Sequence, residues 1–262
     1  MESLAARPFQ WPIAAYLTLA GVAAGAAMVG AWRIAATGPD TARLGRSALL
    51  LALVTISVGG VCLIVDLEGP SRFWMILAHA NPTSVIAWGA RILTLFALTA
   101  GFAWLLEATR RADEPVTGGS RLLLGLVGVV ALALAVYPAF VLRQAAAARP
   151  LWSDPVLVPL FTLSGLHAGL ASVAFLPGGS DALERPAVRR LDGLLLVGLA
   201  ILLPLFTLDS VPLLGLALGV GVLLPLLSLV TRRGSPPLRA LLVLVGSFAL
   251  RGWVVLVGQT VR

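Results

Sequence analysis

Residues 11–32 read WPIAAYLTLAGVAAGAAMVGAW and contain no charged side chain. A helix that crosses a hydrocarbon core of about 30 Å needs roughly 20 apolar residues, so this stretch predicts a membrane-spanning helix. Seven further apolar stretches follow it, near 47–66, 84–106, 122–142, 155–176, 192–208, 211–230 and 240–260. We therefore expect an all-α polytopic membrane protein with eight transmembrane helices.

The composition of the protein supports this class. Of its 262 residues, 59% are hydrophobic and 12% are charged, whereas soluble domains carry about 25% charged residues. A net charge of +7 would suggest nucleic acid in a soluble protein, but all 19 basic residues are Arg and most lie between apolar stretches. We expect the lipid bilayer as a partner and no nucleic acid.

The distribution of Arg predicts the orientation. Twelve Arg follow the first, third, fifth and seventh stretches, and five lie on the other side of the membrane. Basic loops remain cytoplasmic, so both termini are expected to be extracytoplasmic. The sixth and seventh stretches are separated by little more than Asp209, Ser210 and Pro212, and they could instead form one long hairpin.

A weak internal repeat suggests two similar halves. The segment LTLAG at 17–21, continuing to Gly25, recurs as FTLSG at 161–165, continuing to Gly169. Because four predicted helices separate the copies, we expect two parallel four-helix bundles, residues 1–142 and 143–262. The simpler alternative is that glycines four residues apart allow helices to pack closely.

The residues that usually bind metals are scarce. The sequence has a single Cys, Cys62, and two His, of which only His167 lies deep in an apolar stretch. An iron–sulfur cluster needs about four Cys ligands, and a membrane dihaem centre needs paired axial His. We expect no metal site and no haem in this protein.

Most of the polar side chains near the membrane collect on one side of the first predicted bundle. The predicted extracytoplasmic ends of its helices carry Tyr16, Asp66, Asn81, Ser84, Trp88, Arg91 and Tyr137. Polar groups within a membrane are costly, so such a cluster indicates function. A quinone suits it, because Tyr donates an O–H to a carbonyl from an apolar ring and a carboxylate at the membrane edge exchanges protons with water.

Each of these residues also has a structural interpretation. Tyr16 and Tyr137 could serve only as interfacial anchors. Asp66 could cap the second helix or pair with Arg72, and Arg91 could be held in a structural ion pair.

Several motifs together resemble a known family. The segment DLEGPSRFW at 66–74, the segment NPTS at 81–84 followed by Trp88 and Gly89, and the pair Tyr137–Pro138 are similar to motifs of the NrfD/PsrC family of quinol-interacting membrane subunits. The segments PLW at 150–152, SG at 164–165 and LR at 250–251 also resemble it. The resemblance covers nearly the whole sequence.

The resemblance implies a bacterial inner-membrane anchor with two bundles and a quinone, menaquinone or ubiquinone, near the periplasmic face. It implies that Tyr16 and Tyr137 contact the quinone. Two positions depart from the family pattern: Ile13 replaces an Asn one turn before the Tyr16 position, and Glu68 replaces a Gly.

The resemblance also implies partners and roles. An iron–sulfur subunit with 4Fe-4S clusters and a molybdopterin-type catalytic subunit would accompany this protein. From the cluster of polar residues itself we expect Asn81, Ser84 and Trp88 to join the quinone site, and Asp66, Arg72 and Arg91 to handle protons and local charge. We expect a quinone-reactive subunit rather than the subunit that holds the catalytic centre.

A different class of function is an ion- or solute-translocating protein with no redox role. Arg91, His167, Asp209 and Arg251 are the charged or titratable residues that could form a path across the membrane. The concentration of polar groups on one side of the membrane argues against such a continuous path.

Overall fold

A computed structural model describes residues 11–36, 39–65, 74–75, 84–111, 114–144, 150–206, 215 and 217–257. The long helices of the N-terminal half are α1 (Trp11–Ala35), α2 (Pro39–Val65), α4 (Val85–Thr109) and α5 (Gly118–Gln144). Those of the C-terminal half are α6 (Leu157–Ser172), α8 (Pro186–Leu205), α10 (Leu224–Thr231) and α11 (Pro236–Gly252). The shorter elements are η3 (Pro150–Ser153), η4 (Val173–Phe175), α7 (Gly179–Leu183), η5 (Gly219–Leu223) and η6 (Trp253–Val257). The all-α prediction is confirmed for the described residues.

In the part of the protein that the structure describes, six helices are long and apolar enough to cross a membrane. They correspond to the predicted stretches one to five and eight. Helix α8 begins with Arg189, Arg190 and Asp192 in its first two turns, and the apolar helix at 219–231 is shorter. The count of eight transmembrane helices and the location of the termini therefore stay predictions. Residues 207–214, where the sixth stretch ends and the seventh begins, lie outside the described part of the protein.

Several helices begin earlier than their apolar stretches. Arg43 and Arg46 lie within α2, Arg121 within α5, and Arg239 within α11. These arginines, which follow apolar stretches in the sequence, thus lie in helices and not in loops, because Arg is a good helix former and a helix readily extends through it beyond the membrane core. Proline at the first turn of α8 and α11 fixes the start of each of these helices, as expected of a residue that needs no hydrogen-bond acceptor there.

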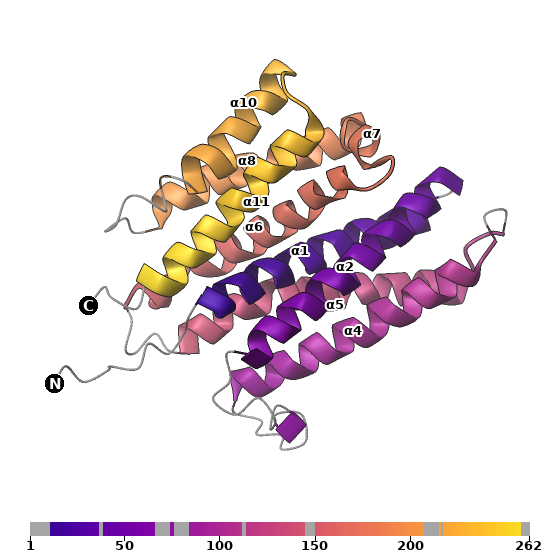
Figure 1. Cartoon of the computed structure of the whole chain (residues 1–262), viewed down its shortest axis with the longest axis horizontal. Helices are drawn as coiled ribbons and strands as arrows, with labels where there is room; N and C mark the ends of the chain where they lie inside the picture. Colours follow the sequence, from indigo (N-terminus) through magenta and orange to yellow (C-terminus); the bar gives the residue numbers. More distant parts are fainter. Residues whose placement is uncertain are drawn as a thin grey trace.

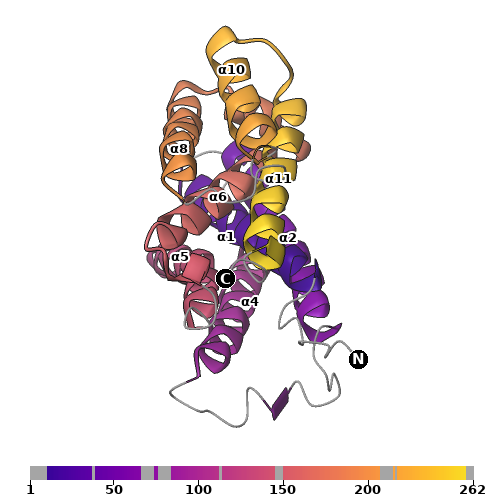
Figure 2. The same ribbon diagram turned by 90° about the vertical axis from the view of Figure 1, so that its left-hand side faces the viewer.

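Helix α1 lies at the centre of the molecule. It packs against α2, α5, α6 and α11, and 78% of its most apolar window is buried, against 28% for α2 and for α4. Figure 2 shows α1 and α6 in the middle, with α8, α10 and α11 on one side and α4 and α5 on the other. The exposed apolar faces of the outer helices are those expected to contact lipid.

The two copies of the repeat pack against each other where α1 crosses α6 (Figure 1). A methyl group added to Gly21 would lie 2.8 Å from the Cα of Gly165, and one added to Gly25 would lie 2.8 Å from the Cα of Gly169. Glycine is therefore needed on both helices, because any side chain would push the two backbones apart. The proposed division into bundles at residue 142 is a separate prediction.

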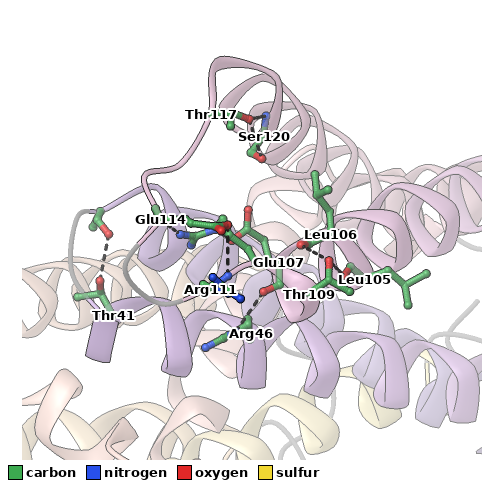
Figure 3. A network of polar contacts seen from close by, with 12 residues as sticks. Thr41, Arg46, Leu105, Leu106, Glu107, Thr109, Arg111, Glu114, Thr117 and Ser120 are labelled. Atoms are coloured by element: carbon green, nitrogen blue, oxygen red, sulfur yellow. Dashed lines mark hydrogen bonds and ion pairs between the residues drawn. The ribbon is translucent and has the colours of Figure 1, made fainter.

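Polar contacts connect helices of the N-terminal half at one of their ends (Figure 3). Arg46 Nη1 donates to the carbonyl oxygen of Glu107 at 3.1 Å, and Arg110 Nε donates to Glu107 Oε2 at 2.7 Å. The backbone N–H of Arg111 donates to Glu114 Oε2 at 3.4 Å. This end carries the Arg residues that predict the cytoplasmic side, and the tyrosines lie toward the other end.

Candidate functional site

Tyr16 and Tyr137 come from two helices that pack together, α1 and α5. They are the two tyrosines of the sequence. Tyr16 is buried in the second turn of α1, and Tyr137 is half-buried in the last two turns of α5. The two residues that the sequence motifs relate to a quinone therefore lie on neighbouring helices of the N-terminal half.

Each tyrosine lies against a glycine of a neighbouring helix. A methyl group added to Gly59 of α2 would lie 3.4 Å from Tyr16 Cδ2. One added to Gly89 of α4 would overlap Cζ and the hydroxyl oxygen of Tyr137. The absence of a side chain at Gly89 is what lets the Tyr137 ring lie on α4. We call Tyr16, Tyr137, Gly59 and Gly89 the tyrosine site.

Neither tyrosine hydroxyl has a hydrogen-bond partner among the described residues. A buried Tyr O–H usually finds a partner, because an unpaired polar group in an apolar environment costs free energy. The tyrosine site therefore offers two O–H donors to a ligand or to the segments beside it.

Arg91 and Trp88 of α4 interact with each other. The guanidinium carbon of Arg91 lies 5.0 Å from the centre of the Trp88 ring, a favourable cation–π distance. No described carboxylate lies within ion-pair distance of Arg91. At about 100° per residue, Arg91 is roughly 160° around the helix from Gly89, so it lies on a different face from the one that meets Tyr137.

Ser84 has a structural role. It is the N-cap residue of α4, and its hydroxyl oxygen accepts a hydrogen bond from the backbone N–H of Ala87 at 3.3 Å. Such a cap satisfies one of the free N–H groups at the start of a helix. Asp66, Glu68, Arg72 and Asn81 lie outside the described residues, and their roles in the site stay predictions.

A second polar cluster lies in the C-terminal half. His167 Nε2 lies 2.8 Å from Asp192 Oδ1, and Arg239 Nε lies 3.4 Å from Asp192 Oδ2. Arg239 Nη2 lies 3.2 Å from Glu184 Oε1, and Arg189 Nη1 lies 3.6 Å from Glu184 Oε2. The first three residues are buried, whereas the Glu184 side chain is 44% exposed. This ion-pair network joins α6, α8 and α11 and runs from the interior of the protein to its surface.

Arg251 of α11 is fully buried among three helices. Its Nε donates to the carbonyl oxygen of Leu17 at 3.1 Å, and its Nη2 donates to that of Phe161 at 3.2 Å. Its Nη1 donates to the hydroxyls of Ser164 at 2.8 Å and Ser247 at 2.5 Å. A guanidinium carries five N–H donors, and here they join α1, α6 and α11 at the glycine crossing.

Several of these partners were missed at the level of the sequence. Asp192, Arg239 and Glu184 lie at the edges of apolar stretches, and Arg239 served there only as a topology signal. Helical spacing from Pro186 places Asp192 nearly two turns inside α8, which was the available signal. The partners of Arg251 include backbone carbonyl groups. Every residue has such a group, so the sequence does not indicate which of them bind Arg251.

Among the described residues, six apolar helices, two of which pack on each other through glycine at the centre, define a multi-pass α-helical membrane protein. The family described as "Polysulphide reductase, NrfD" matches residues 2–216. The protein belongs to this family, which confirms the resemblance inferred from its motifs.

Two curated relatives are similar over most of this region. A polysulfide reductase chain from Wolinella succinogenes is 32% identical over 180 residues, which cover 62% of this protein and 56% of the relative. Protein NrfD of Escherichia coli is 29% identical over 184 residues, covering 62% of this protein and 57% of the relative. The matched segment thus spans little more than half the length of each relative.

A third relative matches a shorter segment. A selenate reductase subunit from Mesobacillus selenatarsenatis is 25% identical over 83 residues, covering 32% of this protein and 20% of the relative.

Proposed function

We propose that this protein is the membrane subunit of a redox complex and that it binds a quinone at the tyrosine site. The observation that carries this proposal is that Tyr16 and Tyr137, on two helices that pack together, have hydroxyls without a hydrogen-bond partner among the described residues. A quinone has two carbonyl oxygens, so its headgroup fits two such donors. Family membership supports the same assignment.

The two tyrosines would share the task of holding the headgroup. Tyr16 would act from the buried side and Tyr137 from the half-buried side, with Gly89 leaving room for the Tyr137 ring. A bound quinone supplies two-electron chemistry coupled to two protons. Asp66, with Glu68 and Arg72, would exchange those protons with water at the membrane edge, and Asn81 would complete the site.

Arg91, Trp88 and Ser84 have a different place in the proposal. Because Arg91 and Trp88 stack on each other away from Gly89, they would set the charge at the rim of the site. Ser84 would hold the start of α4, and through it Gly89, in position.

The proposal includes partners of this protein. An extracytoplasmic iron–sulfur subunit with 4Fe-4S clusters would exchange electrons with the quinone, and a molybdopterin-type subunit would hold the catalytic centre. The names of two relatives, one from a polysulfide reductase and one from a selenate reductase, support membership of a reductase complex. The quinone, menaquinone or ubiquinone, would bind near the periplasmic face of a bacterial inner membrane.

Replacement of Tyr137 with Phe tests the role of the hydroxyl. The ring and its packing on Gly89 remain, so we expect normal assembly with at least tenfold lower quinone-linked electron transfer, consistent with the loss of about one buried hydrogen bond. Thr94→Val is the matched control, because the Thr94 hydroxyl donates only to the Ala90 carbonyl at 2.8 Å within its own helix. Unchanged turnover in Tyr137→Phe would contradict the proposal.

A second candidate function is ion translocation, which the ion-pair network favours. The guanidinium of Arg239 and the carboxylate of Asp192 connect exposed Glu184 with the buried imidazole of His167. Beyond His167, a cavity of about 10 Å³ borders Ser164 and Ser247, both bonded to Arg251; this is close to the smallest volume that holds a water molecule. Of the charged path considered from the sequence, Asp209 lies outside the described residues and Arg91 lies in the other half of the molecule.

Asp192→Asn tests this candidate in the purified complex reconstituted into vesicles. The amide keeps the shape of the side chain and removes its charge, so we expect proton movement into or out of the vesicles to fall while quinone-linked turnover continues. Thr162→Val, which changes a hydroxyl bonded to the Val158 carbonyl within α6, is the control. Equal proton movement in both variants would leave the network a structural role only.

A further inference from the structure

A cavity of about 580 Å³ opens between α8 and α10, at the end of the helices that is predicted to be cytoplasmic. Its lining residues are Glu184, Pro186, Arg189, Arg190, Leu229, Val230 and Arg232. Three of them are Arg and one is an acid. We call this feature the arginine cavity, and it is independent of the tyrosine site.

The charge of the arginine cavity is not balanced by the described residues. Glu184 already contacts Arg239 through Oε1 and Arg189 through Oε2. Arg190 and Arg232 are exposed, and neither has a carboxylate within ion-pair distance in the part of the protein that the structure describes. The cavity therefore presents two guanidinium groups that can bind an anion, and guanidinium groups match the paired oxygens of a phosphate.

The walls of the cavity are fixed by contacts between the two helices. Arg189 Nη2 donates to the carbonyl oxygen of Leu229 at 2.7 Å. A methyl group added to Gly193 would lie 3.4 Å from Leu229 Cδ2, which is ordinary packing contact. The two helices beside Arg190 and Arg232 are thus held together at the cavity.

Apolar side chains continue from the cavity along both helices. Leu194, one turn after Arg190 on α8, is 70% exposed. Val230 and Leu227, one turn apart on α10, are 72% and 58% exposed. Exposed apolar side chains beside a basic pocket suit the acyl chains of a lipid, and a free anion would make no use of them.

We propose that the arginine cavity binds an anionic phospholipid, with its phosphodiester between Arg190 and Arg232 and its acyl chains along Leu194, Leu227 and Val230. The positive charge selects an anionic headgroup over a zwitterionic one. The lipid links α8 to α10 at the surface, beside the ion-pair network.

Native mass spectrometry of the purified protein, with whatever subunits accompany it, tests this site. Dioleoyl-phosphatidylglycerol is titrated into the detergent-solubilised protein, with dioleoyl-phosphatidylcholine as the zwitterionic comparison. We expect retention of phosphatidylglycerol only, and binding about tenfold weaker or more in the double variant Arg190→Ala/Arg232→Ala. The matched control is Arg43→Ala/Arg121→Ala, which removes two exposed arginines on the same side of the membrane and away from the cavity.

A second variant separates lost binding from lost stability. Arg232 follows α10 in the left-handed conformation, with φ 55° and ψ 26°, where Gly is the more favourable residue. Arg232→Gly should therefore match or exceed the wild-type Tm without added lipid and still bind phosphatidylglycerol less tightly. The proposal is overturned if both lipids bind equally, if the variants at Arg190 and Arg232 bind as the wild type does, or if millimolar inorganic phosphate displaces the lipid and binds in its place.

Discussion

The tyrosine site and the ion-pair network use polar groups in opposite ways. In the network, the buried side chains of His167, Asp192 and Arg239 all have partners. In the tyrosine site, Tyr16 and Tyr137 lie on two helices that pack together, and their hydroxyls have no partner among the described residues. Paired polar groups stabilise contacts between helices, whereas neighbouring donors without such partners indicate a place for a ligand.

The two regions should therefore respond differently to substitution. Changes in the C-terminal network and at the glycine crossing should reduce stability, because they leave buried partners unsatisfied or separate packed helices. Changes in the tyrosine site should reduce quinone binding and leave the fold largely intact. The expected loss of stability is largest for substitution of Arg251, smaller for Asp192 and then Gly169, and smallest for Gly89.

Arg251→Leu should have the largest effect. It removes hydrogen bonds to the Leu17 and Phe161 carbonyls and to two hydroxyls, and the loss of several buried partners should cost about 3–5 kcal/mol. Thermal unfolding in mild detergent measures it. Arg91→Leu is the matched control, because Arg91 contacts the Trp88 ring. An equal loss of stability in both variants would contradict the role of Arg251.

Asp192→Ala should have the second largest effect, a loss of about 3 kcal/mol in the free energy of unfolding, because it leaves Arg239 and His167 buried without the carboxylate they share. The same unfolding measurement applies. Asp181→Ala, which removes an exposed acid in the first turn of α7, provides the control. If both variants unfold at the wild-type temperature, the ion-pair network contributes little to stability.

Gly169→Ala should cost about 1–3 kcal/mol, because the added methyl would overlap the backbone of Gly25 and Ala26 where α1 crosses α6. Gly128→Ala on α5 is the control, since nothing lies within 4 Å of its added methyl. Gly128→Ala should be neutral or stabilising by up to about 1 kcal/mol. A stable Gly169→Ala would show that the crossing is looser than the structure indicates.

The repeat is the part of the fold that was predicted best from the sequence. Gly21, Gly25, Gly165 and Gly169 were singled out by the repeated segment and its four-residue spacing, and they do pack against one another. Glycines four residues apart predict a close helix crossing because the packing depends on the local absence of side chains. The six helices that are long enough to span a membrane follow from apolar length in the same way.

The polar contacts were harder to predict. Tyr16 and Tyr137 were identified because they are the two tyrosines of the sequence and lie at similar depth, and the helices that carry them pack together. By contrast, Gly89 was quoted only as part of a motif, although it determines where the Tyr137 ring can lie. Pairings such as Asp192 with Arg239 depend on how α8 and α11 are arranged in space, which no local pattern encodes.

Gly89→Ala should have the smallest effect on stability and a clear effect on the site. The added methyl would overlap the end of the Tyr137 side chain, which is half-buried and can turn aside. We expect a loss below about 1 kcal/mol in stability, the cost of a changed rotamer, together with weaker quinone binding. Gly101→Ala, whose added methyl meets Leu53 Cδ2 at 3.9 Å, should change neither quantity.

The most direct test of the central claim is the quinone content of the purified protein with its accompanying subunits, measured by extraction before and after removal of both tyrosine hydroxyls. We predict about one quinone per wild-type molecule and a large loss in Tyr16→Phe/Tyr137→Phe, with assembly and Tm close to those of the wild type. Full retention of quinone in that variant, or its absence from an intact wild-type complex, would contradict the assignment of the tyrosine site.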